Sequence, residues 1–235
     1  MRLPNATVTF TTRQGGVSEG PYESLNLGAL TEDVLERVVE NRHRAAQRAG
    51  VQPERMAMGY QVHGTDLREW TEPPLDRAYA EPGGKELDRV DGHLTRVPGV
   101  GLLVLVADCY PVALSDGEQA AMLHCGWRPL AAGMIEKALA RFSSPPAAAV
   151  GPGIGGCCYE VGDEVRERFA DVDGAASGRM LDLRTVIASK LAAGGVEDVE
   201  HVYRCTSCEP ELYFSHRRDG GVTGRQAGII VRDGH

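Results

Sequence analysis

The sequence has no apolar run of the roughly 18 residues that a membrane-spanning helix needs. Its longest apolar stretch, residues 100–107, contains a glycine and is typical of a buried strand. Basic side chains are in deficit, because 25 Lys and Arg stand against 33 Asp and Glu in 235 residues, a formal net charge of −8. Proteins that bind a nucleic-acid backbone normally carry a basic stripe. Neither a membrane nor a nucleic acid is therefore expected as a partner.

Cysteine is also scarce, with six residues in the chain, too few for a disulfide scaffold. The segment MRLPNATVTF lacks the basic-then-apolar pattern of a secretory signal. Reduced thiols and a cytoplasmic location are therefore expected. No internal repeat or obvious linker divides the sequence, which favours a single domain over residues 1–235.

Strand and helix patterns are mixed without strict βαβ alternation, which predicts an α+β fold with mixed sheets covered by helices. The expected strands are residues 7–11, 56–62, 101–107, 111–115, 119–123, 147–150, 200–203 and 227–231. The expected helices are residues 31–49, 130–142, 161–169 and 183–193. Thr31 and Asp182 are typical N-caps, and Gly50 and Gly194 stand where helices commonly end.

A hairpin pattern carries the main prediction about chemistry. Asp116-Gly117 lies between two apolar runs and is typical of a two-residue type I′ turn. Pairing outward from that turn places Cys109 directly opposite His124. Such a thiolate and imidazole can share a metal ion or form a thiolate–imidazolium pair. If the strand that ends at His63 neighbours the hairpin, the resulting Cys/His₂ set is typical of a catalytic zinc with one open position.

Two further groups of residues have open interpretations. A second zinc site is conceivable from four cysteines, Cys157, Cys158, Cys205 and Cys208. Vicinal cysteines are unusual tetrahedral ligands, so packing of these thiols as small buried hydrophobes is the favoured interpretation. Residues 215–218 (SHRR) form a basic cluster with Arg225. That cluster indicates either a solvated loop or a site for an anion such as phosphate.

Seven ordered motifs give the sequence a resemblance to a known family over nearly its whole length. They are FTTR at 10–13 with GG at 15–16, SLNLG at 24–28, QVHG at 61–64, ADC at 107–109, His124 with GWR at 126–128, GP at 151–152 with IG at 154–155, and residues 214–228. On these motifs the sequence resembles the bacterial laccase-domain family, often labelled polyphenol oxidase, to which multifunctional purine nucleoside phosphorylases belong.

The resemblance implies a zinc-dependent enzyme that phosphorolyses adenosine, inosine and methylthioadenosine and also deaminates adenosine. Purine nucleosides and phosphate are the partners it implies, and copper is the alternative metal. It also implies a layered αββα fold related to the catalytic domain of a bacterial deamidase toxin. The family's catalytic and metal-binding residues match His63, Cys109 and His124. The polar motif positions expected to contact substrate or phosphate are Arg13, Asn26 and Arg128.

The sequence departs from the family's usual HAGWRG motif at Cys125 and Pro129. Cys125 is expected to point to the opposite face from His124, and Pro129 to reshape the turn that carries Arg128. Three alternative functions stay open. They are a metal-free cysteine hydrolase or deamidase with Cys109 as nucleophile and His124 as base, a copper-dependent polyphenol oxidase, and a zinc-stabilised binding module.

Overall fold

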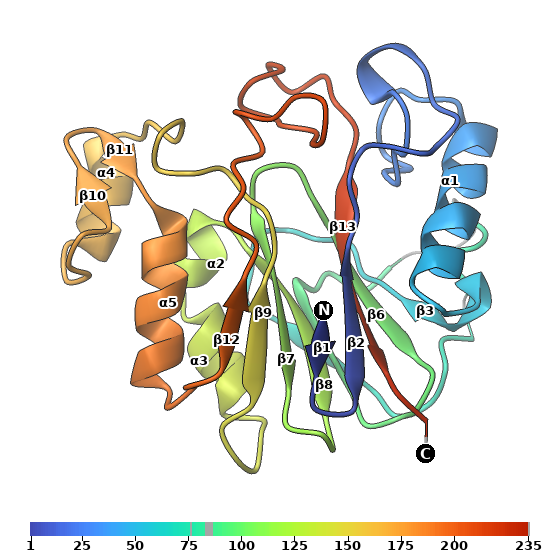
Figure 1. Cartoon of the computed structure of the whole chain (residues 1–235), viewed down its shortest axis with the longest axis horizontal. Coiled ribbons are helices and arrows are strands. Elements are labelled where there is room, and N and C mark those ends of the chain that lie inside the picture. The colour runs from blue at the N-terminus through green and yellow to red at the C-terminus, as the bar shows by residue number, and fades with distance from the viewer. Residues whose placement is uncertain (76, 83–86, 235) are drawn as a thin grey trace.

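The computed structural model describes residues 1–75, 77–82 and 87–234, and its strands form two main sheets (Figure 1). The five-stranded sheet has the order β1 (Arg2–Leu3), β2 (Ala6–Phe10), β13 (Gln226–Arg232), β6 (Gly101–Val106) and β3 (Met56–Ala57). The six-stranded sheet has the order β12 (Val199–His201), β9 (Ala147–Val150), β7 (Tyr110–Ser115), β8 (Ala120–Cys125), β5 (Gly92–Thr95) and β4 (Leu67–Trp70). A small hairpin joins β10 (Ala176–Ser177) to β11 (Met180–Leu181).

The helices lie on the outer sides of the two main sheets (Figure 1). The five-stranded sheet is covered by α1 (Leu35–Arg48). The six-stranded sheet is covered by α2 (Trp127–Ala131), α3 (Met134–Leu139) and α5 (Leu183–Ala193). Further short elements are α4 (Asp163–Arg166) and the 3₁₀ turns Gly20–Tyr22, Pro53–Arg55 and Glu167–Phe169. Among the described residues, no helix has both the length and the apolar character needed to cross a membrane.

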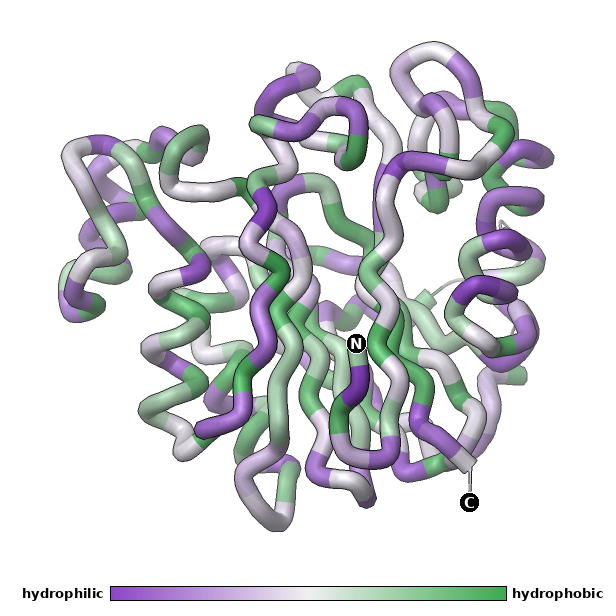
Figure 2. Tube along the Cα trace, viewed as in Figure 1, coloured by the Kyte–Doolittle hydropathy of each residue, from purple (hydrophilic) through white to green (hydrophobic). Residues whose placement is uncertain are grey.

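Three clusters of buried side chains separate these layers. One lies between α1 and the five-stranded sheet, one between the two sheets, and one between the six-stranded sheet and its helices. The first cluster includes Ala45 and Leu103, and the second includes Val104 and Met122. The third includes Leu123 and Ile187. Figure 2 shows hydrophobic residues concentrated along the central strands and hydrophilic residues along α1. The predicted α+β class with mixed sheets is confirmed.

The first predicted helix, 31–49, starts later than expected, at Leu35. The Thr31 hydroxyl does not cap it and instead donates a hydrogen bond to the carbonyl of Gly28 at 2.7 Å. Local side-chain bonding of this kind competes with helix formation. The predicted end is correct, since Gly50 follows the helix with a φ of +71° that a glycine adopts readily.

The remaining helix predictions are correct for one segment and too long for two. The helix predicted at 183–193 is α5, and the Asp182 carboxylate accepts the Arg184 N–H at 2.9 Å as an N-cap. The helix predicted at 130–142 is divided into α2 and α3 by Gly133, whose φ is +87°. In the segment 161–169 the α-helix is confined to Asp163–Arg166 and a 3₁₀ turn follows.

The hairpin has a different register from the one that the sequence predicts. The chain reverses one residue later than predicted, around Gly117 and Glu118, because Asp116 pairs with Gln119 and donates its N–H to the Gln119 carbonyl at 3.3 Å. Pro111, rather than Cys109, lies opposite His124. The predicted direct pairing is therefore wrong by two positions. A shift of two keeps the same face, since side chains alternate with a period of two along a strand.

The strand predicted at 56–62 is also mostly absent, because β3 contains only Met56–Ala57. At Gln61, four residues further on, the side-chain amide forms the hydrogen bonds to β6 that a paired strand backbone would form. Its amide donates to the Leu105 carbonyl and accepts the Leu105 N–H, both at 2.8 Å. In addition, β3 pairs with β6 in the five-stranded sheet, so it does not neighbour the hairpin. The other predicted strands match observed ones to within two residues at each end.

Candidate metal centre

The three predicted metal ligands come together at the boundary between the two sheets. His63 follows β3, Cys109 lies in the connection from β6 to β7, and His124 lies on β8. The connection at Cys109 passes from the five-stranded sheet to the six-stranded sheet. One potential ligand atom from each residue lies within 4.8 Å of the other two. The rings of His63 and His124 meet edge to face with centroids 4.7 Å apart.

The set is buried on one side and accessible on the other. His124 is buried, Cys109 is half-buried and His63 is exposed. Two imidazoles and one thiolate are donors that zinc prefers, and three protein ligands are the usual number at a catalytic zinc. The donor chemistry therefore fits a zinc ion with a position left for a small molecule on the accessible side.

Asp91, which the sequence analysis did not identify, holds both histidines. Its buried carboxylate lies 2.7 Å from Nδ1 of His124. It also accepts the backbone N–H groups of Val62, His63 and Gly64 at 2.8–3.0 Å. These bonds support His63 in a left-handed backbone conformation, φ +59°, which residues other than glycine adopt uncommonly. An acidic residue directly before the buried strand β5 is the sequence signal for this role.

The charge of Asp91 determines which nitrogen of His124 is free. Burial opposes ionisation of this carboxyl, but hydrogen bonds from His124 and from the N–H of Gly64 hold its pKa below the ordinary value. An ionised carboxylate only accepts hydrogen bonds, so Nδ1 of His124 carries the proton between them. The Nε2 atom of His124 is then available to a metal, the arrangement typical of metal-binding histidines.

Cys109 and His124 also shift each other's protonation. Burial disfavours the thiolate, but the charge of His124 and hydrogen bonding to His124 and His63 lower the pKa of Cys109 to about 6. Burial likewise disfavours the imidazolium, but the charge of Cys109 and the hydrogen bond to Asp91 raise the pKa of His124 to about 9. In the metal-free protein the two groups therefore form a thiolate–imidazolium pair at neutral pH.

Asp108 fixes the backbone next to Cys109. Its φ is +90°, which is unusual for a residue with a side chain. The carboxylate accepts the Thr206 hydroxyl at 2.6 Å and the Arg217 N–H at 2.7 Å. The carbonyl accepts the Ile154 N–H at 2.8 Å. Two loops distant in sequence, the one after β9 and the one after β12, thus hold the residue that precedes the thiol.

Two of the predicted substrate-contacting residues form hydrogen bonds to other residues of the protein. Asn26 is fully buried, and its amide group donates to Thr31 and Asp33 at 2.9 Å. Its carbonyl oxygen accepts the N–H groups of Gly28 and Arg225 at 3.0 and 2.9 Å. These bonds connect the loop at 26–33 to the segment before β13.

Arg13 is held in a similar way by the backbone. Its guanidinium donates to the carbonyls of Glu23 at 2.6 Å and Pro210 at 2.8 Å, and it lies 4.6 Å from the centroid of the Phe214 ring. Arg128, in contrast, is exposed at the start of α2 and stacks over Trp127 at 4.7 Å. Of the three predicted contacts, Arg128 has the guanidinium that is most available to an anion.

Two further arginines, Arg217 and Arg225, interact with Tyr159 and with Cys109, respectively. The guanidinium of Arg217 is 5.0 Å from the Tyr159 ring. Burial and the charge of Cys109 raise the pKa of Tyr159 to about 12, while Arg217 and Arg128 act in the opposite direction. Burial lowers the pKa of Arg225, and the charges of Asp108 and then Cys109 partly compensate. The charges of Arg217 and Arg128 thus act on Tyr159, and the charge of Arg225 interacts with that of Cys109.

The two departures from the family motif lie away from the ligands. Cys125 is fully buried in the cluster between the six-stranded sheet and its helices, on the opposite face from His124 as expected. Burial raises the pKa of its thiol well above the ordinary value. Pro129 is buried within α2, so the segment that carries Arg128 is the first part of a short helix.

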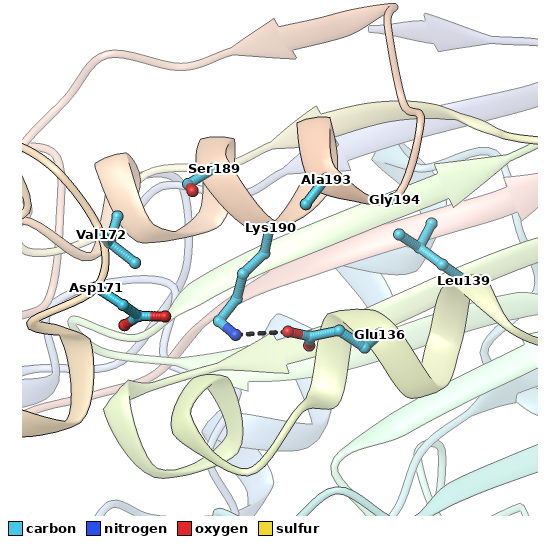
Figure 3. Close-up of a pocket in the computed structure, with 8 residues that line it drawn as sticks. All are labelled: Glu136, Leu139, Asp171, Val172, Ser189, Lys190, Ala193 and Gly194. Atoms are coloured by element: carbon cyan, nitrogen blue, oxygen red, sulfur yellow. Dashed lines mark hydrogen bonds and ion pairs between the residues drawn. The ribbon is translucent and has the colours of Figure 1, made fainter.

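A separate pocket of about 370 Å³ lies in the outer helical layer, where α3 faces α5 (Figure 3). Lys190 extends into this region and forms an ion pair with Glu136 at 2.5 Å. None of the residues predicted from the sequence to bind metal or substrate lines this pocket. It is therefore distinct from the Cys/His₂ set.

Comparison with known proteins gives consistent matches along the chain. A family model described as multi-copper polyphenol oxidoreductase laccase matches residues 7–233. The chain is 40% identical over 232 residues to purine nucleoside phosphorylase YfiH of Escherichia coli (strain K12), covering 93% of this chain and 90% of that protein. It is 37% identical over 255 residues to purine nucleoside phosphorylase YlmD of Geobacillus stearothermophilus, covering 97% and 90%.

Solved structures show the same similarity in three dimensions. The crystal structure of YlmD from Geobacillus stearothermophilus matches with a TM-score of 0.89 at 33% identity, covering 98% of this chain and 93% of that chain. The hypothetical protein YfiH of Bacillus licheniformis matches with a TM-score of 0.90 at 31% identity, covering 96% and 92%.

Proposed function

The chain belongs to the multi-copper polyphenol oxidoreductase laccase family, and on that premise we propose that it is a purine nucleoside phosphorylase. Relatives named purine nucleoside phosphorylase support nucleoside phosphorolysis at the level of the family. In detail, we propose a zinc-dependent enzyme that acts on adenosine, inosine and methylthioadenosine and also deaminates adenosine. We propose that it works in the cytoplasm as a single domain.

The observation that carries the proposal is the Cys/His₂ set with one accessible side. His63, Cys109 and His124 would hold the zinc ion, which would supply a Lewis acid to a bound substrate. Asp91 keeps Nε2 of His124 free and holds the backbone of His63 (2.7 and 2.9 Å). The protein thus fixes the ligands in advance, which is what second-layer hydrogen bonds do at metal sites.

Phosphorolysis also requires a place for phosphate. An oxygen of phosphate bonds to C1′ of the ribose as the bond from C1′ to the purine nitrogen breaks, giving the free base and a sugar 1-phosphate. Arg128, Arg217 and Arg225 are the proposed phosphate contacts, because guanidinium groups bind phosphate well. Arg217 and Arg225 each donate one guanidinium nitrogen to backbone carbonyls, so exposed Arg128 is the leading contact of the three. Arg13 and Asn26 are proposed to shape the bordering loops, because Arg13 donates two guanidinium nitrogens to carbonyls and Asn26 is fully buried.

The thiolate–imidazolium pair favours a second candidate, a metal-free cysteine hydrolase or deamidase. Cys109 would act as the nucleophile and His124 as the base. A chelator would then leave activity intact while an alkylating reagent abolished it. Inhibition by the chelator and recovery on adding zinc would instead favour the metal enzyme.

Copper-dependent phenol oxidation is less well supported by the ligands. Among residues 1–75, 77–82 and 87–234, two groups contain three or more potential metal ligands, and one of these contains histidine. A multicopper centre needs histidines for several ions. A single-ion site agrees better with zinc, and metal analysis of the purified protein distinguishes the two metals.

Chromatography of adenosine incubated with the protein, with and without phosphate, tests the proposal directly. Phosphate-dependent formation of adenine that is lost in Cys109→Ala supports phosphorolysis at this site. Cys125→Ala is the matched control, because it removes a thiol from the core one residue after His124 and should keep activity. Inosine formed without phosphate would make deamination the main reaction. Unchanged adenosine under all conditions would overturn the proposal and favour the cysteine hydrolase.

A further inference from the structure

Four cysteines outside the Cys/His₂ set meet at one edge of the six-stranded sheet. Cys157 and Cys158 lie in the loop after β9, and Cys205 and Cys208 lie in the loop after β12. Because β9 and β12 are parallel neighbours, their carboxyl ends lie at the same edge. An isolated parallel bridge between Gly153 and Cys205 continues the pairing into these loops.

The distances between the sulfur atoms suit a single metal ion. All four Sγ atoms lie within 4.8 Å of one another. Cys208 Sγ is 3.6 Å from Cys157 Sγ and 3.3 Å from Cys158 Sγ. A disulfide would place two of them about 2.05 Å apart. Tetrahedral zinc with bonds of about 2.3 Å to sulfur places its ligands about 3.8 Å apart, which is close to what is observed.

The surroundings of the thiols do not resemble a hydrophobic core. Cys157 and Cys208 are exposed, while Cys158 and Cys205 are half-buried. The interpretation of these residues as small buried hydrophobes is therefore wrong. Four thiols that are exposed or half-buried and have their sulfur atoms directed toward one another are what a metal site requires.

The backbone of the two loops is arranged around the sulfur atoms. The Gly155 N–H donates to Cys205 Sγ at 3.2 Å. A Cβ on Gly155 would lie 3.2 Å from Cys157 Sγ and 3.4 Å from the Cys205 Cβ, so a side chain there would crowd the cluster. The Cys208 N–H closes the turn by donating to the Cys205 carbonyl at 3.2 Å.

We propose that Cys157, Cys158, Cys205 and Cys208 bind a second zinc ion as four thiolates. Four sulfur ligands complete the tetrahedron, so this site is closed and structural. Binding releases the four thiol protons and leaves a complex with a net charge of −2. A guanidinium nitrogen of Arg184 lies 3.3 Å from the position of a Cβ on Gly155 and partly offsets that charge.

The second ion cross-links two loops that hold the first site. Ile154, in the loop after β9, donates its N–H to the Asp108 carbonyl at 2.8 Å. Thr206, in the loop after β12, donates its hydroxyl to the Asp108 carboxylate at 2.6 Å. Asp108 directly precedes Cys109, so the four-cysteine site stabilises the backbone from which that thiol projects.

Zinc content per chain, measured on the full-length protein after expression with zinc and purification without chelator, tests the second site. The wild type should contain two zinc ions, and both Cys205→Ser/Cys208→Ser and Cys109→Ala should contain one. Ser207→Ala, within the same loop, is the matched control and should keep two. Cys109→Ala lacks a ligand of the Cys/His₂ site, so its zinc content measures the four-cysteine site alone. That zinc content is the same whether or not the Cys/His₂ site binds zinc in the wild type. Cys109→Ala protein without zinc would overturn the four-cysteine proposal.

Cobalt spectra and thiol labelling give readouts that do not depend on activity. Cobalt-loaded Cys109→Ala should show the intense absorption of a four-thiolate site, and Cys205→Ser/Cys208→Ser should lose it. If that double variant does not fold, labelling of the wild type decides. In zinc-loaded protein, Cys157 and Cys208 should resist iodoacetamide despite their exposure and react once zinc is removed. Rapid labelling with zinc present, iron in place of zinc, or disulfides found by mass spectrometry would overturn the proposal.

Discussion

The thiol of Cys109 lies against Gly126, one position beyond the last paired residues of the β7–β8 hairpin, Tyr110 and Cys125. A Cβ on Gly126 would come within 2.7 Å of Cys109 Sγ and within 3.5 Å of His63 Cδ2. The absence of a side chain at this position therefore leaves room for the thiol between the two histidines.

Gly126→Ala should displace the thiol without disturbing the backbone, since the φ of −88° at Gly126 is open to alanine. A displacement of about 1 Å in a catalytic constellation can cost on the order of 100-fold in turnover. Metal affinity should fall as well. Gly64→Ala is the matched control, because its Cβ would meet only ordinary contacts at 3.5 Å. Equal zinc affinity and turnover in Gly126→Ala and the wild type would contradict the assignment.

Asp91→Asn should weaken zinc binding at the Cys/His₂ set, although Asp91 is not itself a proposed ligand. The neutral amide is a poorer acceptor for Nδ1 of His124 and for the three backbone N–H groups, so both histidines lose their orientation. Loss of such a partner typically costs about 10- to 100-fold in metal affinity. Competition with a zinc-binding dye would measure the change. Asp88→Asn, at an exposed ion pair with Arg68, should leave the affinity as it is, and a similar effect from both variants would contradict the role of Asp91.

The reactivity of Cys109 in metal-free protein should follow its lowered pKa. The thiolate is present above a pH of about 6 and is lost as the pH falls below that value. Alkylation by iodoacetamide, read by mass spectrometry, should therefore be half-maximal near that pH at Cys109, while buried Cys125 stays unmodified. His124→Ala removes the main stabilising charge, so its midpoint should move to higher pH. A wild-type midpoint near 9, the ordinary value for a thiol, would contradict the thiolate–imidazolium pair.

Arg128→Ala should raise the KM for phosphate without lowering thermal stability, because the guanidinium is exposed and stacks on the neighbouring Trp127 ring. A hydrogen bond to a charged group is worth about 1.5–3 kcal/mol, which corresponds to a tenfold or larger rise. An unchanged KM for phosphate would remove Arg128 from the proposed phosphate contacts.

Arg13→Ala should show the opposite pattern. The substitution removes two hydrogen bonds to the carbonyls of Glu23 and Pro210 and the stacking on Phe214. The midpoint of thermal unfolding should therefore fall, with a smaller change in the KM for phosphate than in Arg128→Ala. A large rise in that KM with unchanged stability would return Arg13 to the substrate contacts.

Local patterns in the sequence determined several features correctly. The periodicity of 183–193, capped by Asp182, predicts α5, and the apolar run at 101–107 predicts the buried strand β6. These signals depend on neighbouring residues alone. The motifs around His63, Cys109 and His124 also identify the candidate ligands, since family resemblance is read directly from residue order.

Tertiary structure decided how those residues meet. The hairpin prediction brought Cys109 to the correct face with a register wrong by two positions, because the place where the chain reverses depends on the bonds between Asp116 and Gln119. His63 reaches the site from the five-stranded sheet, where Gln61 replaces the strand ladder. Neither arrangement follows from local propensity.

Sequence and tertiary structure differ most for residues whose role depends on contacts between distant segments. Asp91 has no motif, yet its buried carboxylate holds both histidines. Cys157 and Cys208 are far apart in the sequence and meet because β9 and β12 pair in parallel. Residue order determined which candidate ligands this protein contains. The packing of two sheets and the pairing of distant strands decided which of them share a site, because that depends on contacts between segments that sequence periodicity does not encode.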